Sequence, residues 1–251
     1  MSGSLGITWA GHATVLIELD GVRLLTDPVL GSRVGPLRRI APPPAREVGE
    51  RLDAVLVSHL HLDHADAASL RRLPRSTPVL APRGAGRWLT ARGFETIHEL
   101  DAGDEVAVGR LRAIATPALH DGHRHPLGAS TGAIGFVARG SRSCYFAGDT
   151  DLHPAMAELA GSIDVALLPI WGWGPKLGAG HLDPERAADA AARIGPRVAI
   201  PVHWGTLARP WPFPRPRDPS RPARAFAAWT ARRAPEVEVR VLAPGERTEV
   251  R

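Results

Sequence analysis

The chain has 251 residues, of which 44% are hydrophobic and 23% are charged, so it is long enough to bury a substantial core. No apolar run approaches the roughly 18 residues of a membrane-spanning helix, which argues against a transmembrane protein. The formal net charge of +5 comes from arginines scattered among alanines and prolines, and this pattern favours a solvated surface over tight binding to DNA or RNA.

In chain order, short β-type runs predict strands at residues 5–10, 14–19, 22–27, 53–59, 77–82, 105–116, 132–138, 143–149, 164–170, 197–203 and 236–243. Helical periodicity predicts helices near residues 66–72, 83–92, 153–160, 183–194 and 221–233. Early strands alternate as in a half-buried antiparallel sheet, whereas several later strands are apolar throughout and are separated by helices. With no internal repeat and no Gly/Ser linker, we expect one α/β domain over residues 1–251, with two mixed sheets and helices outside.

Three long stretches rich in Pro, Gly, Arg and Trp interrupt these elements, at residues 31–50, 171–181 and 204–222. Long loops in a compact domain usually carry function. Four of the seven tryptophans lie in the last two stretches: Trp171, Trp173, Trp204 and Trp211. They either pin these loops to the core or line a substrate pocket. In the last predicted helix, Phe226 and Trp229 are three residues apart, which favours a face turned to the core over a membrane face.

The stretch "SHLHLDHAD" at residues 58–66 places three histidines and two aspartates in nine positions. It follows a buried strand and leads into a helix, so alternation directs His59 and His61 to one side. Asp63 and His64 then curve back toward a second point. Burying these side chains together is costly unless a cation compensates, so the stretch predicts a metal site.

Other predicted strands end in residues of the same kind, namely His120, Asp149 and His203. Each residue lies just past the carboxyl end of an apolar strand, where it could complete the metal site. Near the first of them the choice stays open, because three further candidates crowd His120: Asp121, His123 and His125.

These motifs carry a family resemblance. "HLHLDH" matches the HxHxDH signature of the metallo-β-lactamase superfamily, and the later candidates follow in that superfamily's order. The segments "GHATVLIELDGVRLLTDPVL", "YFAGDT", "HLDPERA" and "PVHWGT" further resemble the branch of N-acyl-phosphatidylethanolamine-hydrolysing phospholipase D, itself similar to the ascorbate-6-phosphate lactonase group. The resemblance spans nearly the whole chain and implies an αββα four-layer sandwich.

The resemblance also implies a pair of zinc ions and their ligands. One ion would be held by His59, His61 and His120, the other by Asp63, His64 and His203, with Asp149 bridging the two. Mn²⁺ or Fe²⁺ could substitute, because nitrogen and oxygen ligands accept them. A hydroxide bridging the two ions would be the nucleophile.

Further residues complete the expected site. The candidate catalytic residues are Asp63, Asp149 and His181, the last of which lies just ahead of a predicted helix start. Asp27 resembles the first aspartate motif of the superfamily and would fix the orientation of a ligand. Candidate substrate contacts are Trp171, Trp173, His181 and Trp204. His12 also fits the branch's pattern, with no role assigned.

Together these features predict a metal-dependent hydrolase of a small molecule, with a phosphodiester favoured and a lactone or another ester as the alternative. A metal-binding protein without turnover is a third hypothesis, against which the complete ligand set argues. The lone Cys144 lies inside a predicted strand and is expected in the core rather than at the metals. The first residues, "MSGSLGITWAGH", lack the features of a signal peptide, which predicts a cytoplasmic protein.

Overall fold

The computed structural model describes residues 3–122, 131–174, 177–210, 212–213 and 217–251. Two seven-stranded sheets dominate this part of the chain. The first has the order β17 (Arg247–Val250), β1 (Leu5–Gly11), β2 (Thr14–Leu19), β3 (Val22–Thr26), β6 (Ala54–Leu56), β7 (Val79–Pro82) and β8 (Ile97–Leu100). The second has the order β16 (Glu238–Val239), β14 (Val198–Val202), β13 (Val165–Pro169), β12 (Ser143–Phe146), β11 (Ile134–Arg139), β10 (Leu111–Pro117) and β9 (Glu105–Val108).

Each sheet combines antiparallel and parallel neighbours. In the first sheet β17, β1, β2 and β3 pair antiparallel, and β3, β6, β7 and β8 pair parallel. In the second sheet the parallel half runs from β12 to β16 and the antiparallel half from β9 to β12. The prediction of two mixed sheets is therefore confirmed.

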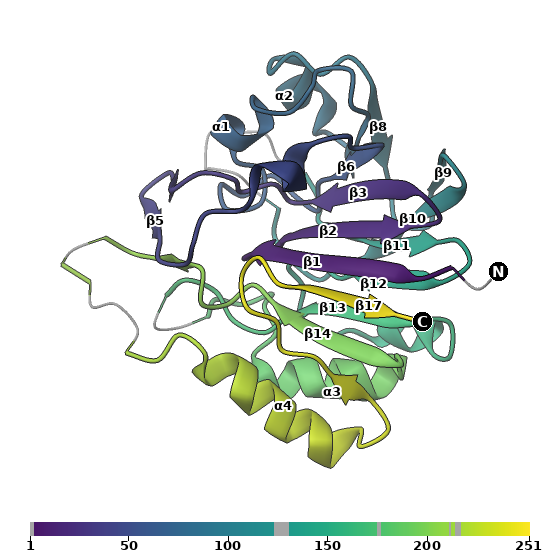
Figure 1. The fold of residues 1–251 in the computed structure, drawn as a ribbon, viewed down its shortest axis with the longest axis vertical. Coiled ribbons are helices and arrows are strands. Elements are labelled where there is room, and N and C mark those ends of the chain that lie inside the picture. Colours follow the sequence, from purple (N-terminus) through teal and green to yellow (C-terminus); the bar gives the residue numbers. More distant parts are fainter. Residues whose placement is uncertain (1–2, 123–130, 175–176, 211, 214–216) are drawn as a thin grey trace.

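Helices cover the outer faces of the two sheets (Figure 1). On the first sheet lie α1 (Ala67–Leu70) and α2 (Gly86–Thr90), and under the second lie α3 (Pro184–Ile194) and α4 (Arg221–Arg233). Strand alternation explains the layers: Val55 belongs to the apolar cluster beneath α1 and α2, whereas its neighbour Leu56 belongs to the core between the sheets. The arrangement is the expected αββα sandwich.

The core between the sheets draws on both ends of the chain. Trp9 of β1 and Phe136 of β11 are fully buried in the same cluster, and β1 pairs with β17 near the chain's end. Cys144 is buried in β12, which confirms its expected place in the core. In α4, Phe226 is buried and Trp229 packs partly buried against the core, as their spacing predicted.

Several elements differ from the prediction. A third, three-stranded sheet forms within the stretches 31–50 and 204–222, for which the sequence predicts loops. Its strands are β15 (Leu207–Ala208), β5 (Leu37–Arg39) and β4 (Arg33–Val34). Arg39 holds it in place by donating to the carbonyl oxygens of Val29 and Gly31. The stretch 31–50 also contains the 3₁₀ helix η1 (Arg46–Gly49). Residues 153–160 form the 3₁₀ helix η2 (Pro154–Leu159) instead of an α-helix.

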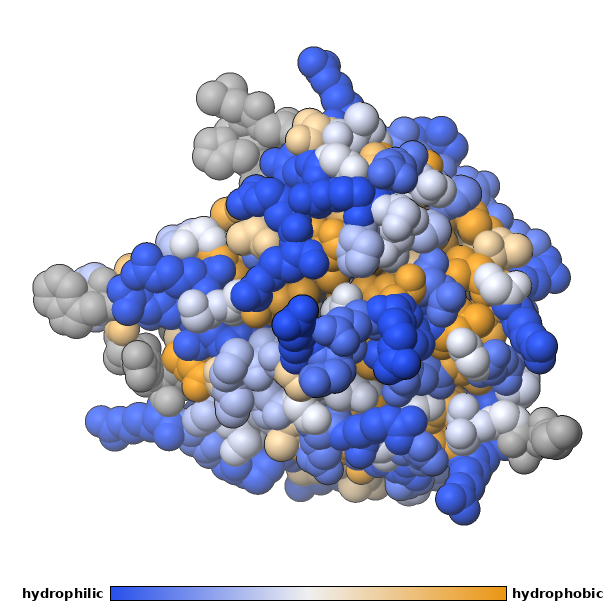
Figure 2. Space-filling view, turned by 45° about the horizontal axis from the view of Figure 1, so that its top comes forward, coloured by the Kyte–Doolittle hydropathy of each residue, from blue (hydrophilic) through white to orange (hydrophobic). Residues whose placement is uncertain are grey.

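The outer surface carries mainly hydrophilic residues on the face that Figure 2 shows, with hydrophobic residues visible between them. Within the described ranges, no helix has the length and apolar character that crossing a membrane requires.

Candidate metal centre

The predicted ligands lie just beyond the carboxyl ends of strands in both sheets. His59 and His61 follow β6, and His120 follows β10. Asp149 follows β12, and His203 follows β14. Because β12, β13 and β14 are parallel, their carboxyl ends share one edge, which brings side chains far apart in the sequence together.

One group of candidate ligand atoms comes from His59, His61 and His120, all within 4.8 Å of one another. His120 Nε2 lies 3.2 Å from His61 Nδ1. The Nδ1 atom of His120 donates to the carbonyl oxygen of Gly180 at 2.9 Å, so in the neutral ring Nε2 keeps its lone pair. This is the arrangement of a metal-ligating imidazole held by its other nitrogen.

A second group contains Asp63, His64 and His203, together with His12. The Nε2 atoms of His64 and His203 face each other at 3.0 Å. His203 donates through Nδ1 to the carbonyl oxygen of Trp171 at 2.6 Å, which leaves its Nε2 as an acceptor. Two imidazole nitrogens that approach this closely need a proton or a cation between them.

Asp149 stands between the two groups. Its Oδ2 lies 3.1 Å from His64 Nε2, and its Oδ1 lies 3.3 Å from His203 Nε2. It also forms a cluster of possible ligands with His120 and His181. One carboxylate therefore has an oxygen within reach of residues from both groups.

The donor set fits divalent cations. Two buried atoms at its centre, His59 Nε2 and Asp149 Oδ1, have no hydrogen-bond partner in the described part of the chain. A buried acceptor without a partner is costly, and an ion would remove that cost. Imidazole nitrogens and carboxylate oxygens are ligands that zinc and similar ions take.

The electrostatics of the cluster agree with cation binding. Burial lowers the pKa of His59 well below its ordinary value and that of His120 to about 4, so both rings stay neutral with a lone pair available. Burial opposes charge on His64 as well, yet Asp149 and Asp27 raise its pKa well above the ordinary value. Burial also disfavours charge on Asp149, but His203 and His64 hold its pKa well below the usual range. The carboxylate of Asp149 thus stays charged and attracts positive charge.

Asp27 lies where an orienting group is expected. Its carboxylate is fully buried and accepts from Ser58 at both oxygens, at 2.7 Å from the backbone nitrogen and 2.6 Å from Oγ. Oδ2 also accepts from His64 Nδ1 at 2.6 Å, which turns the Nε2 atom of that ring toward Asp149. Burial raises the pKa of Asp27 despite these hydrogen bonds.

The sequence assigns no role to His12, and the structure places it in the second group of candidate ligands. Its buried ring lies with Nε2 3.0 Å from Asp63 Oδ2. The residue has a φ of 54° in the tight connection between β1 and β2, directly after Gly11. A histidine at a hairpin turn between two buried strands was the available signal, but its contact with Asp63 spans 51 positions.

His181 lies ahead of α3, as predicted, and points toward Asp149. Its Nε2 is 3.3 Å from Asp149 Oδ2, while its Nδ1 faces the carbonyl oxygens of Gly178 and Ala179. Burial would lower the pKa of His181, but the hydrogen bond to Asp149 raises it. The imidazole is part-exposed, so it can hold a proton at the edge of the cluster.

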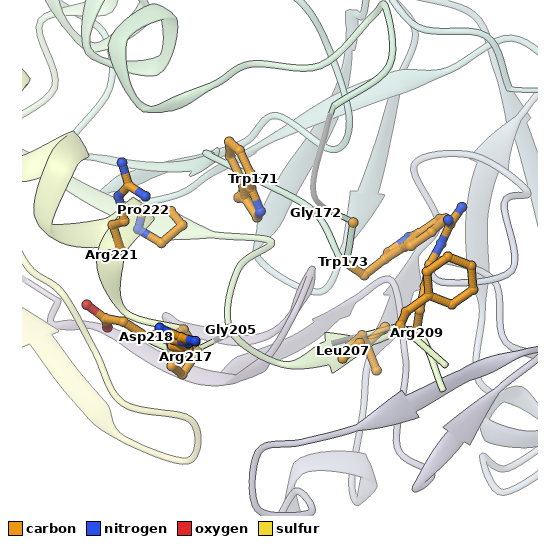
Figure 3. A pocket seen from close by; sticks show the side chains of 14 residues that line it. Trp171, Gly172, Trp173, Gly205, Leu207, Arg209, Arg217, Asp218, Arg221 and Pro222 are labelled. Carbon is orange, nitrogen blue, oxygen red and sulfur yellow. The ribbon is translucent and has the colours of Figure 1, made fainter. Parts of the chain in front are cut away.

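The tryptophans divide between two environments. Trp173 donates from Nε1 to Asp63 Oδ2 at 2.9 Å, and both Trp171 and Trp173 line a cavity of about 350 Å³ (Figure 3). Trp204 instead is 6% exposed, stacks on Trp9 at 4.8 Å between ring centroids and donates to Pro201 O. The structure thus does not bring Trp204 to the cavity. His123, His125 and Trp211 lie outside the described residues.

Comparisons with known proteins agree with this fold and cluster. The family model of the beta-lactamase superfamily domain matches residues 22–204. An N-acyl-phosphatidylethanolamine-hydrolyzing phospholipase D of Caenorhabditis elegans is 34% identical over 229 residues, covering 79% of this chain and 63% of that protein. A metal-dependent hydrolase of Methanopyrus kandleri is 34% identical over 253 residues, covering 97% of this chain and 99% of that one.

Among solved structures, Igni18, a metallo hydrolase of Ignicoccus hospitalis, superposes with a TM-score of 0.71 at 25% identity and covers 99% of both chains. The chain belongs to the metallo-β-lactamase superfamily. Within it, the protein is a metal-dependent hydrolase, and its His/Asp cluster is the candidate metal site.

Proposed function

We propose that this hydrolase binds two divalent ions, zinc by preference, and cleaves a phosphodiester. The proposed ligands of one ion are His59, His61 and His120, those of the other are Asp63, His64 and His203, and Asp149 serves both. The observation that carries the proposal is the position of Asp149, which lies beside His64 and His203 of the second group and within the cluster that includes His120 of the first. One of its buried oxygens has no hydrogen-bond partner in the described part of the chain. We also propose that residues 1–251 form one domain, because β1 and β17 pair within one sheet.

When bound, two such ions would lower the pKa of a water molecule and offset negative charge on the substrate. The chain's own residues would orient the ligands and supply a proton. Asp27 holds the ring of His64 through Nδ1, and the Trp171 carbonyl oxygen holds that of His203. His181 Nε2 lies 3.3 Å from Asp149 Oδ2, where the protonated ring can donate a proton to the leaving oxygen.

Two observations support a phosphodiester over a lactone or another ester. A relative with 34% identity is named an N-acyl-phosphatidylethanolamine-hydrolyzing phospholipase D. His181 also fits the task, because an alkoxide that leaves a phosphorus atom needs a proton more than the alkoxide of a lactone with a polarised carbonyl.

Metal content and substrate class can be tested together. Elemental analysis of purified protein should find about two ions per chain, and Asp149→Asn should lose most of both, whereas His203→Ala should lose mainly one. The metal-loaded enzyme should cleave bis(p-nitrophenyl) phosphate faster than p-nitrophenyl phosphate or γ-butyrolactone. A full single site with no second ion would contradict the paired centre, and a preference for the lactone would replace the phosphodiester.

A further inference from the structure

The cavity of about 350 Å³ shares Trp171 and Trp173 with the candidate metal centre, and its other lining residues have no part in the site described above (Figure 3). Three stretches of the chain form its walls, at residues 171–174, 205–209 and 217–222, together with Phe213. They belong to the Trp-, Pro- and Arg-rich stretches that follow β13 and β14, the second of which runs into the first turn of α4.

One wall is shared with the metal centre. Trp173 lines the cavity and donates to Asp63, while the carbonyl oxygen of Trp171 accepts from His203. A Cβ added to Gly172 would lie 3.8 Å from His203 Cε1. The segment 171–173 therefore contacts two candidate ligands and also lines the cavity.

The cavity wall has an excess of positive charge. Three arginines line it, namely Arg209, Arg217 and Arg221, and none of them forms an ion pair with a carboxylate of the described residues. The lining also contains Asp218, but Arg224 and Ser220 already occupy its oxygens. Because the acid is neutralised by a residue outside the lining, the three guanidinium groups are available to an anion.

The same wall offers aromatic faces. The guanidinium carbon of Arg209 lies 5.2 Å from the ring centroid of Trp173 and 4.8 Å from that of Phe213. Figure 3 shows Arg209 beside the Trp173 ring, with Arg217 and Arg221 toward the other end of the cavity. A guanidinium stacked on rings loses little freedom when it binds an anion, and exposed ring faces accept a planar group.

We propose that this cavity binds the part of the substrate remote from the bond that is cleaved, and that this part is a planar apolar group carrying its own negative charge. The inference rests on the proposed phosphodiesterase function, which places the reacting phosphate at the candidate ligands that segment 171–173 contacts. Trp171, Trp173 and Phe213 remove the planar group from water, and the arginines recognise its charge.

The test uses the metal-loaded protein and isothermal titration calorimetry with naphthalene-2-sulfonate, which has a planar ring and a charge but no cleavable bond. Arg209→Ala and Arg217→Ala should each weaken binding by about tenfold, the size of one charge-assisted hydrogen bond. Arg209→Lys, which keeps the charge but not the planar fork, should fall between wild type and Arg209→Ala. Arg87→Ala, an exposed arginine of α2, is the matched control and should bind as wild type.

Two further probes test the charge and the ring of the ligand separately. Naphthalene-2-methanol should bind about tenfold more weakly than the sulfonate and should not respond to the arginine variants. Methanesulfonate should bind more weakly still, because it has no ring to bury. Equal sulfonate affinity in wild type, Arg209→Ala and Arg217→Ala would overturn the inference.

Failure of the proposed function gives a different result. If the arginine variants lose sulfonate binding but wild type cleaves no phosphodiester, the cavity stands and the phosphodiesterase assignment fails. If wild type cleaves bis(p-nitrophenyl) phosphate while the variants keep full sulfonate affinity, the enzyme assignment stands and the cavity inference fails.

Discussion

Asp63 joins three separate parts of the chain at the candidate metal centre. Its Oδ2 lies 3.0 Å from His12 Nε2 and 2.9 Å from Trp173 Nε1, and these partners come from the β1–β2 turn and from the loop after β13. Burial disfavours its charge, but the hydrogen bond to His12 holds its pKa well below the usual range. A carboxylate fixed at one oxygen presents the other in a defined direction, so His12 is a positioning residue for a proposed ligand.

Removing His12 should weaken metal binding without removing a proposed ligand. We expect His12→Ala to lower the affinity for one of two zinc ions by about 10- to 100-fold, the usual effect of losing a partner of a ligand. Competition with a chromogenic chelator measures this. His12→Asn tolerates the positive φ and tests whether the backbone alone matters. His98→Ala in β8 is the control, and equal affinities in all four proteins would refute the positioning role.

A variant of His181 can distinguish two roles of this residue, that of a proton donor and that of a metal ligand. We expect His181→Ala to keep two ions but to lower turnover of an unactivated phosphodiester by about 10² to 10⁴, as loss of a general acid does. With a nitrophenyl leaving group the loss should be smaller, because that group needs little protonation. Steady-state rates on both substrates decide the matter. Equal losses on both would indicate binding instead, and a variant that sheds metal would make His181 a ligand, as its cluster with His120 and Asp149 allows.

At the scale of elements, the sequence predicts those helices and strands whose formation depends on a local pattern of residues. Apolar runs such as 164–170 and 197–203 became β13 and β14 because buried strands are continuous in hydrophobic residues. The sequence did not predict the strand β17: the alternating run 236–243 supplies only the two-residue β16, and the mainly polar residues 247–250 pair with β1 at the opposite end of the chain. The third sheet was missed for the same reason, since β5 is three residues long and finds β15 about 170 positions away.

The candidate site also has a part that local sequence patterns predict and a part that they do not. Ligand-type residues at strand ends are visible in sequence because each belongs to a short local motif, and the fold brings them together. The contact of His12 with Asp63 and the cavity beyond Trp173 depend on how loops from separate strands pack, and no local spacing encodes that. The place of Trp204 could not be predicted for the same reason, because it stacks on Trp9, which is distant in sequence.

The start of α3 is set by Asp183. The carboxylate accepts from the backbone nitrogen of Arg186 at 2.9 Å, and Pro184 occupies the first turn. Loss of an N-cap costs about 1 kcal/mol, so Asp183→Ala should lower the free energy of unfolding by that amount in urea titrations. Ser220 precedes α4 without a capping bond from its side chain, so Ser220→Ala should change stability by less than about 0.5 kcal/mol. Equal effects of the two changes would mean that the cap contributes nothing.

At the scale of the whole molecule, the proposed ions would join the two sheets. His59, His61 and Asp63 follow β6 of the first sheet, whereas His120, Asp149 and His203 follow strands of the second. Ions bound across this junction stabilise the folded chain alone, because the unfolded chain does not hold the ligands together. At an ion concentration 100-fold above the dissociation constant, one site adds about 2.7 kcal/mol.

Removal of the ions should therefore lower the melting temperature. For a chain of this size about 1 kcal/mol corresponds to roughly 2–4 °C, so stripping one such site with EDTA should lower Tm by about 5–10 °C, and stripping two should lower it further. Differential scanning calorimetry with and without EDTA measures the shift, and added zinc should restore it. In Asp149→Asn, which lacks the proposed shared ligand, EDTA should change Tm far less than in wild type. An EDTA shift of wild-type size in that variant would show that the ions join the sheets without Asp149.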